Sequence, residues 1–408
     1  MVRSREVPDQ SHKSSERWFN RNLLFMGLTS LFSDASHEMA TALLPMLLAS
    51  IGASPAALGA VEGLSDAAAS AVKLLSGWYT DRIGRRKPAA VIGYAFTAVK
   101  AALYWATTWP QVLLVRVVAW FGRGLRNPPR DAMLAGAVPP RYYGRAFGFH
   151  RAMDTSGAVL GPLLAAFFLT FVSFRRIFLI SLIPGLLAVA AMAWGVREPS
   201  GVRRGQGYLF WESARSLPRS FRRFLLAVGI FGLGDIAHSL LILRTIQLLT
   251  PVWGATRAGA TAILLYALHN AFYAAFSYPA GTLGDRLGKG TLLVLGYGLF
   301  AVMAIGWAFA GPSLYQLVPL FLVAGLYLAI EDALEGAMTA ELVPADIRGT
   351  GYGTLATVNG IGDLGASIIV GFLWARFSPA VGFSYAAVIG ALGALAMLWA
   401  VRASAAKA

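Results

Sequence analysis

The chain is dominated by long runs of apolar residues, each about the length that crosses a lipid bilayer. A spanning helix needs about 20 mostly apolar residues. Twelve such runs lie near 23–50, 55–79, 88–108, 111–137, 145–172, 176–196, 224–249, 258–281, 290–311, 314–342, 349–375 and 379–401. The chain is 57% hydrophobic and 13% charged, about half the charged share of a soluble domain. The sequence therefore predicts an all-α membrane protein with twelve transmembrane helices.

Basic residues indicate how these helices are oriented. Alternate gaps between the runs collect Arg and Lys, whereas the other gaps are short and nearly uncharged. Under the positive-inside rule, the basic gaps face the cytoplasm. We therefore expect an integral plasma (inner) membrane protein with both termini cytoplasmic. The net charge of +15 lies in these short gaps, so we expect the lipid bilayer as partner and no nucleic acid.

The longest polar gap divides the chain into two halves that repeat. We expect a tail (1–22), a six-helix bundle (23–196), a linker (197–223), a second bundle (224–402) and a short tail (403–408). The segment from Gly77 to Gly84 (Gly-Trp-Tyr-Thr-Asp-Arg-Ile-Gly) is echoed from Gly281 to Gly288 (Gly-Thr-Leu-Gly-Asp-Arg-Leu-Gly). Two pseudo-symmetric six-helix bundles form a transporter architecture with the substrate near the midplane.

The first of these repeated segments also carries a family resemblance. With its basic continuation, Gly77-x-x-x-Asp81-Arg82-x-Gly84-Arg85-Arg86, the chain resembles the major facilitator superfamily over nearly its whole length. The resemblance implies alternating access between the halves. It also implies a gating network that latches the halves in the outward-facing state, formed by Asp81, Arg82, Arg85 and Arg86, with Asp285 and Arg286 in the second copy.

Two further resemblances concern the transported substrate. Gly157-x-x-x-Gly161-Pro162 resembles the antiporter motif of the family, which is associated with efflux. Segments beginning at Ser33, Gly122 and Gly144 resemble a branch that includes nickel-resistance permeases. The resemblance thus favours an exporter and raises the question of a metal substrate.

Ionisable residues inside the apolar runs are candidates for substrate or proton binding. Each costs at least ~2.5–3.5 kcal/mol on insertion scales, so it is expected to be functional. His residues recur beside carboxylates or an amide at helical spacing, as Asp34, His37 and Glu38, then His150 and Asp154, then Asp235 and His238, and finally His269 and Asn270. Imidazole and carboxylate suit divalent transition metals, and they also carry protons. Asp34, His37, Asp235 and His238 are therefore candidate metal ligands, with structural Asp–His hydrogen bonds as the alternative.

A basic stripe on the fourth run faces an acidic counterpart in the repeat. Arg123, Arg126 and Arg130 share one helix face, and alignment of the repeats places Glu331 opposite Arg126 and Glu335 opposite Arg130. We interpret these residues as inter-half ion pairs of the gating network. The alternative is recognition of an anionic substrate, because Arg suits carboxylate and phosphate groups.

These features predict a secondary active transporter and no enzyme. The first hypothesis is proton-coupled efflux of a divalent metal ion or small metal complex. The alternatives are a proton-coupled antiporter of an organic solute or drug, and an importer of an anionic metabolite or metal chelate. No nucleotide-binding loop occurs in the sequence, so ATP drive is not expected. We expect a monomer without cofactors.

Overall fold

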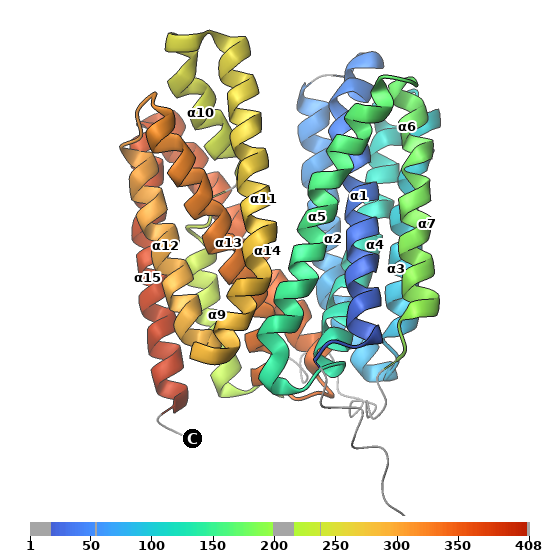
Figure 1. The fold of residues 1–408 in the computed structure, drawn as a ribbon, viewed down its shortest axis with the longest axis vertical. Helices are drawn as coiled ribbons and strands as arrows, with labels where there is room; N and C mark the ends of the chain where they lie inside the picture. Colours follow the sequence, from blue (N-terminus) through green and yellow to red (C-terminus); the bar gives the residue numbers. More distant parts are fainter. Residues whose placement is uncertain (1–17, 54, 199–215, 237, 406–408) are drawn as a thin grey trace, which may run out of the picture.

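The computed structural model describes residues 18–198 and 216–405, apart from residues 54 and 237. Within these residues every regular element is helical, and the helices form two groups side by side (Figure 1). The predicted N-terminal tail and the predicted linker between the halves lie mostly outside the described residues.

The helices follow the apolar runs of the sequence. The first group contains α1 (Arg21–Ser50), α2 (Pro55–Ile83), α3 (Lys87–Ala98), η2 (Val99–Trp105), α4 (Trp109–Gly136), η3 (Pro140–Tyr142), α5 (Tyr143–Leu169), α6 (Phe174–Ile180), α7 (Leu182–Ala190) and η4 (Ala191–Gly195). The second group contains α9 (Arg219–Gly232), α10 (His238–Trp253), α11 (Ala255–Leu287), α12 (Lys289–Ala308), α13 (Leu314–Leu342), α14 (Arg348–Arg376) and α15 (Pro379–Ala405).

Some predicted helices are interrupted rather than continuous. The sixth run is split at Ser181, whose carbonyl oxygen accepts a hydrogen bond from Ser36 Oγ at 2.7 Å. The seventh run is split between α9 and α10, and Asp235 lies in the gap. Non-helical backbone at membrane depth persists only where protein or a cavity surrounds it. The break therefore places Asp235 at a position that lipid does not reach.

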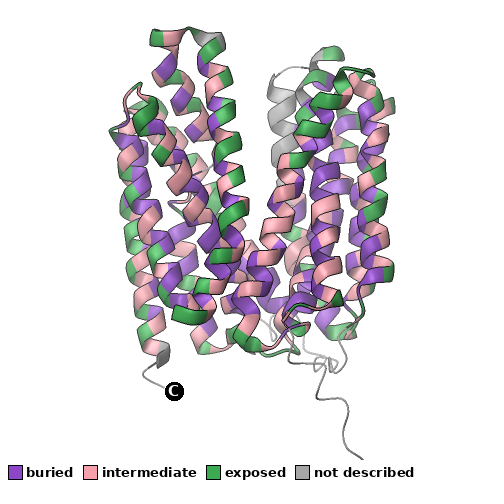
Figure 2. Cartoon of the chain, viewed as in Figure 1, coloured by how far each residue is buried: buried purple, intermediate pink, exposed green. Residues whose placement is uncertain are grey.

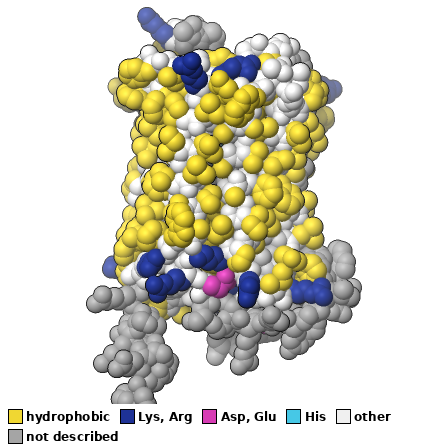
Figure 3. Space-filling model, turned by 90° about the vertical axis from the view of Figure 1, so that its right-hand side faces the viewer, with side chains coloured by type: hydrophobic (Ala, Val, Ile, Leu, Met, Phe, Trp, Pro, Cys, Tyr) yellow, Lys and Arg dark blue, Asp and Glu magenta, His cyan; other side chains and the backbone are white. Residues whose placement is uncertain are grey.

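The outer surface of the molecule is that of a membrane protein. Figure 3 shows apolar side chains over the middle of one face, with Lys and Arg at both ends. Large apolar side chains of α5 to α7, among them Leu163, Phe167 and Ile183, are more than half exposed. Figure 2 shows buried and exposed residues alternating along the same helices. A soluble monomer rarely exposes so large an apolar surface, so we interpret this surface as lipid-facing.

Length and hydropathy support this interpretation directly. In the described residues, seven helical stretches are long and apolar enough to cross a membrane: 140–169, 174–195, 257–287, 289–308, 314–342, 348–376 and 379–403. Of the other predicted spans, α1 and α4 carry several ionisable side chains, and α9 and α10 are each too short. The less apolar helices α1 and α4 carry Asp34, His37, Glu38 and the Arg stripe, whereas the other candidates on α5, α11 and α13 lie within apolar spans.

The two groups meet at one end of the molecule, where glycines allow their backbones to touch. A Cβ atom on Gly77 of α2 would lie 2.0 Å from the carbonyl oxygen of Gly349 in α14. A Cβ atom on Gly281 of α11 would lie 1.9 Å from the carbonyl oxygen of Gly144 in α5. Small residues permit such close helix crossings. Figure 1 shows the groups close together at this end and apart at the other.

A carboxylate beside each crossing holds the start of a helix from the opposite group. Asp81 of α2 accepts hydrogen bonds from the main-chain N–H groups of Gly349 at 3.1 Å and Thr350 at 2.7 Å, at the start of α14. Thr350 Oγ1 and Arg86 Nη2 also donate to Asp81, at 3.0 and 2.7 Å. Arg86 in turn donates to the carbonyl oxygen of Ala345 at 2.7 Å. A negative charge at a helix N-terminus is stabilised by the unpaired N–H groups there.

Asp285 repeats this arrangement from the other side. It accepts hydrogen bonds from the N–H groups of Gly144 at 2.8 Å and Arg145 at 2.9 Å, at the start of α5. Lys289 Nζ lies 3.4 Å from Asp285 Oδ1. We call the Asp81 and Asp285 contacts the two latches. Of the basic residues expected in the gating network, Arg86 takes part, whereas Arg82, Arg85 and Arg286 are exposed.

The first prediction concerns the glycine crossings. Gly281→Ala adds a Cβ atom against the backbone of α5, and overpacking of this kind costs about 1–3 kcal/mol. We expect a roughly 5–150-fold shift away from the latched arrangement. The chain has no Cys, so spin labels at Arg141→Cys and Leu287→Cys report the separation of the groups by pulsed electron resonance. Gly298→Ala, where nothing lies within 4 Å of the added Cβ, is the control. Equal distance distributions in the two variants would contradict the close crossing.

The second prediction concerns the latch carboxylates. Asp81→Asn removes the charge and replaces one acceptor oxygen by an NH₂ group, which cannot accept the N–H bonds at the start of α14. Hydrogen bonds to charged groups contribute about 1.5–3 kcal/mol, so the latched population should fall more than about tenfold. Spin labels at Ile83→Cys and Asp346→Cys measure this. Arg85→Gln should have no effect, because Arg85 is exposed. A larger effect of Arg85→Gln than of Asp81→Asn would overturn the assignment.

Candidate functional site

A cavity of about 690 Å³ lies between the two groups of helices. Residues of α2, α4 and α5 line one side, and residues of α13 and α14 line the other. Phe147 of α5 and Tyr352 of α14 both line it, with their ring centroids 5.8 Å apart. Both residues lie within three residues of a latched helix start. This aromatic pair therefore stands between the cavity and the latched end.

The first group gives the cavity a basic wall. Arg123 and Arg130 of α4, Arg151 of α5 and Lys73 of α2 line it. Arg130 is buried and forms an ion pair at 2.9 Å with Asp131, the next residue. An Arg guanidinium does not lose its proton in a protein, so this wall keeps its positive charge through any transport cycle.

The second group gives the cavity an acidic wall. Asp332 and Glu335 of α13 and Asp363 of α14 line it. Glu335 accepts hydrogen bonds from Tyr297 Oη at 2.6 Å and from Asn359 Nδ2 at 2.8 Å. Carboxylates gain and lose protons, unlike Arg, so the charge of this wall can change.

An ion pair connects the two walls. Arg151 Nη2 lies 3.5 Å from Asp332 Oδ1 across the boundary between the groups. Arg151 Nη1 also lies 3.5 Å from Asp154 in its own helix, and Tyr273 Oη donates to Asp332. Arg151 is therefore shared between a carboxylate of each half.

The predicted pairs between the Arg stripe and the two glutamates are not what the structure shows. Arg126 Nη2 lies 3.9 Å from Asp34, and Arg126 Nη1 donates to Ser33 Oγ at 2.5 Å. The guanidinium of Arg126 also lies 4.2 Å from the ring centre of Tyr94, which holds it inside the first half. Arg130 pairs with Asp131 in the same half, and Glu331 Oε2 is buried with no partner among the described residues.

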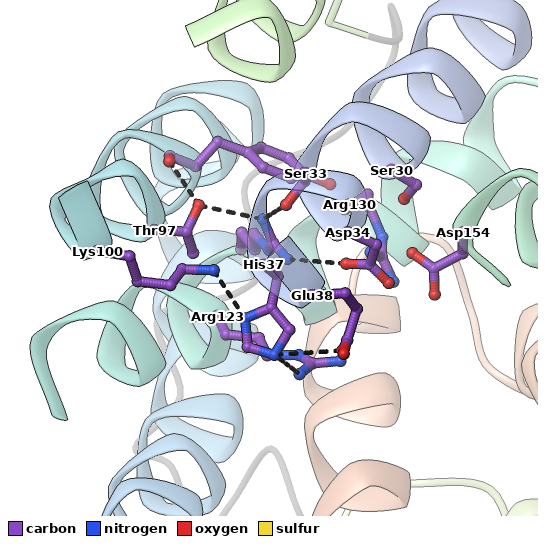
Figure 4. Close-up of polar contacts among 12 residues, drawn as sticks. Ser30, Ser33, Asp34, His37, Glu38, Thr97, Lys100, Arg123, Arg130 and Asp154 are labelled. Atoms are coloured by element: carbon purple, nitrogen blue, oxygen red, sulfur yellow. Dashed lines mark hydrogen bonds and ion pairs between the residues drawn. The ribbon is translucent and has the colours of Figure 1, made fainter. Parts of the chain in front are cut away.

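The α1 candidates Asp34, His37 and Glu38 belong to a polar cluster inside the first half (Figure 4). Lys100 Nζ lies 2.7 Å from His37 Nδ1. On the other side of the ring, His37 Nε2 lies 3.5 Å from Arg123 Nη1 and 3.7 Å from Glu38 Oε1. An ammonium and a guanidinium therefore flank the imidazole, which disfavours a cation as its ligand.

The matching group near α10 is separate from this cluster. Asp235 accepts a hydrogen bond from Tyr327 Oη at 3.1 Å. The ring centroids of His238 and His269 lie 4.8 Å apart, and His269 Nδ1 lies 3.4 Å from the carbonyl oxygen of Phe321.

Metal ligation by Asp34, His37, Asp235 and His238 thus finds no support. Asp34 and His37 contact residues of the first half, and Asp235 and His238 contact residues of the second. None of the four lines the cavity. The part of the chain that the structure describes contains no group of three or more His, Cys, Asp or Glu placed to hold a metal ion.

The α5 and α11 candidates also turn out to make local contacts. His150 Nε2 lies 2.7 Å from Ser30 Oγ of α1, and Asn270 interacts with the hydroxyl of Tyr266 one helical turn away. Cβ atoms on Gly157 and Gly161 would lie 2.3 and 2.7 Å from carbonyl oxygens of α1. The glycine motif expected from antiporters therefore packs α5 closely against α1 in this structure.

Sequence reasoning missed several residues that line the cavity. Arg151, Asp332 and Asp363 were not among the candidates, although each is an ionisable residue within an apolar run. Arg151 follows His150 directly, and Asp332 follows Glu331. The same rule that selected their neighbours, that intramembrane charge indicates function, would have found them.

Comparison with known proteins agrees with this architecture. The model of the Major Facilitator Superfamily matches residues 26–266 and 245–408. "Uncharacterized MFS-type transporter MJ1317" of Methanocaldococcus jannaschii is 32% identical over 393 residues, covering 96% of this chain and 97% of the relative. Multidrug resistance protein MdtH of Cronobacter sakazakii is 26% identical over 372 residues, covering 86% of each chain. The expected nickel-resistance branch finds no support in these matches.

The fold is also that of a solved transporter. The crystal structure of the E. coli fucose:proton symporter FucP aligns with a TM-score of 0.76 at 15% identity, covering 94% of this chain and 99% of that one. The two six-helix halves expected from the sequence fit this fold. The chain therefore belongs to the Major Facilitator Superfamily and is an integral membrane transporter, not an enzyme.

Proposed function

We propose that this protein exports a polar organic solute in exchange for protons, by alternating access between its two halves. The observation that carries the proposal is the cavity between the halves, which ionisable side chains line on both walls. Its volume of about 690 Å³ lies in the range of pockets for small organic molecules, about 300–1,000 Å³.

The positions of the latches and of the basic gaps indicate which end of the molecule faces the cytoplasm. The helix ends that the latches join border the gaps rich in Arg and Lys, which the positive-inside rule assigns to the cytoplasm. The latched state is then closed toward the cytoplasm and faces outward. Solute released outside leaves the cavity in this state, and protons enter it.

The acidic wall supplies the proton sites of the proposal. Glu335 lines the cavity, and its environment includes the charges of Asp332 and Asp363. Protonation relieves the repulsion between such neighbouring carboxylates. A proton on Asp332 would also remove the charge that holds Arg151 across the boundary, which links proton binding to movement of the halves.

Two observations favour an organic solute over a metal ion as the exported substrate. The described residues offer no group of three or more metal-ligating side chains, and His37 faces Lys100 and Arg123. The MdtH relatives are named for multidrug resistance, which is the organic alternative expected from the sequence.

The third prediction tests the proton site. In proteoliposomes with an imposed pH gradient, wild-type protein should move at least one compound of a panel of organic cations, anions and zwitterions, ethidium among them, against its concentration gradient. Glu335→Gln has a side chain of the same size, and its remaining oxygen can accept the hydrogen bond from Asn359 Nδ2. The amide cannot take up a proton as the carboxylate does. We expect the variant to lose gradient-driven transport more than about tenfold while it retains solute exchange without a gradient. Asp346→Asn, at an exposed residue outside the cavity, should behave as wild type.

Two results would contradict the proposal. Gradient-driven transport by Glu335→Gln at the wild-type rate would remove Glu335 from the proton path. A proton flux that appears with Ni²⁺ or Zn²⁺ and with no organic compound of the panel would support metal export instead.

A further inference from the structure

The charges that line the cavity are divided between the halves. In the lining that the structure describes, Lys73, Arg123, Arg130 and Arg151 all belong to the first half. Three of the lining carboxylates, Asp332, Glu335 and Asp363, belong to the second half, and Asp131 belongs to the first. A bound solute therefore contacts a mainly basic surface on one side and an acidic surface on the other.

The basic wall has capacity for an anionic group. Within the described residues, Arg123 contacts His37 Nε2 at 3.5 Å and the ring of Trp120 at 6.0 Å, and the charges of Asp34 and Asp154 act on it without a direct ion pair. Arg130 lies seven residues further on the same helix face and forms its ion pair with Asp131. Guanidinium groups bind carboxylates through paired N–H donors. A solute carboxylate in the cavity would give Arg123 a direct ion-pair partner.

The acidic wall has capacity for a cationic group. Asp332, Glu335 and Asp363 lie close enough for their charges to interact with one another and with Asp235 behind them. Arg151 of the first half reaches Asp332 at 3.5 Å, and Asp363 has interaction partners of its own. An ammonium group against Glu335 and Asp363 would reduce the repulsion between them.

An unsatisfied acceptor supports a solute with N–H groups. Asn127 of α4 lines the same cavity, and its Oδ1 atom is buried without a hydrogen-bond partner in the described part of the chain. A buried acceptor without a partner costs about 1–3 kcal/mol, so an N–H donor of the solute would be stabilising there.

The walls are close enough for one small molecule to bridge them. Arg151 and Asp332 approach to 3.5 Å, so a positive and a negative group of opposite halves meet at the cavity. Arg123, Arg130, Glu335 and Asp363 line the same cavity of about 690 Å³, so a small molecule with two opposite charges can contact both walls. A singly charged molecule would be attracted by one wall and repelled by the other, which selects against it.

We propose that the transported solute is zwitterionic, with a carboxylate bound by Arg123 and Arg130 and an ammonium group bound by Glu335 and Asp363. This inference rests on the proposed function, because it identifies the substrate class of the same cavity. Binding of both charges also connects the two halves through the solute, so a zwitterion favours their approach around it.

The test is ligand-induced thermal stabilisation of the purified full chain. Phenylalanine, leucine and glycyl-phenylalanine are each compared with the C-terminal amide, which is a cation, and the N-acetyl form, which is an anion. We expect at least one zwitterion to bind about tenfold more tightly than both of its singly charged counterparts. The proposal is wrong if, for each of the three zwitterions, the amide or the N-acetyl form binds as tightly or more tightly. It is also wrong if none of the nine compounds stabilises the protein.

Two variants assign the charges to their walls. Arg123→Gln should make the zwitterion and its amide bind equally, because the carboxylate loses its partner. Asp363→Asn should make the zwitterion and its N-acetyl form bind equally. Asp346→Asn should leave the selectivity unchanged, because Asp346 is exposed and does not line the cavity. The proposal is wrong if Arg123→Gln removes the preference over the N-acetyl form and Asp363→Asn removes the preference over the amide. It is also wrong if both variants change the binding of all compounds equally.

The transport assay separates this proposal from the proposed function. If a pH gradient drives transport of ethidium while no zwitterion binds, the zwitterion proposal fails and proton-coupled export stands. If zwitterions bind with the expected selectivity but no gradient drives their movement, the binding proposal stands and proton coupling fails.

Discussion

The arrangement of the halves depends on two carboxylates that bind helix N-termini across the boundary between them. Asp81 holds the start of α14, and Asp285 holds the start of α5. Each latch works only because glycines let the helices approach until their backbones touch, as at Gly77 and Gly281. The charge, the helix dipole and the missing side chain thus act together at each crossing. Because both latches lie at one end, the rest of the boundary is left for a cavity.

The cavity adds a second connection between the halves, and this one can change with protonation and binding. Arg151 and Asp332 join the basic and acidic walls, and Arg151 lies one helical turn after Phe147 of the aromatic pair in α5. A ligand shifts the balance between two conformations only by the difference in its affinity for them. In the proposed exchange, protons and solute compete for the acidic wall and provide such a difference, and the hydrogen bonds of the latches oppose the change. Transport then requires changes at the cavity to weaken hydrogen bonds at the latched end.

Sequence periodicity could predict much of the fold, but less of the site. The apolar runs matched the helices, and Asp81 and Asp285 of the repeated motif bind helix starts of the opposite half, while their gating role stays a prediction. Helical spacing places His37 beside Asp34 on one face, but it does not say whether that face turns to the cavity or to Lys100 in the same half. Side-chain packing decides this, and packing is a property of several helices at once. The break at Asp235 likewise depends on neighbours such as Tyr327, which are distant in sequence.

If alternating access moves the halves as rigid bodies, the two latches form and break together. Hydrogen–deuterium exchange of the amides of Thr350 and Gly144, in the detergent-solubilised full chain with and without bound solute, tests it most directly, because these N–H groups donate to Asp81 and Asp285. Exchange at both helix starts should be slow in the latched state and faster at both when the halves rearrange. Faster exchange at one helix start with no change at the other would contradict it.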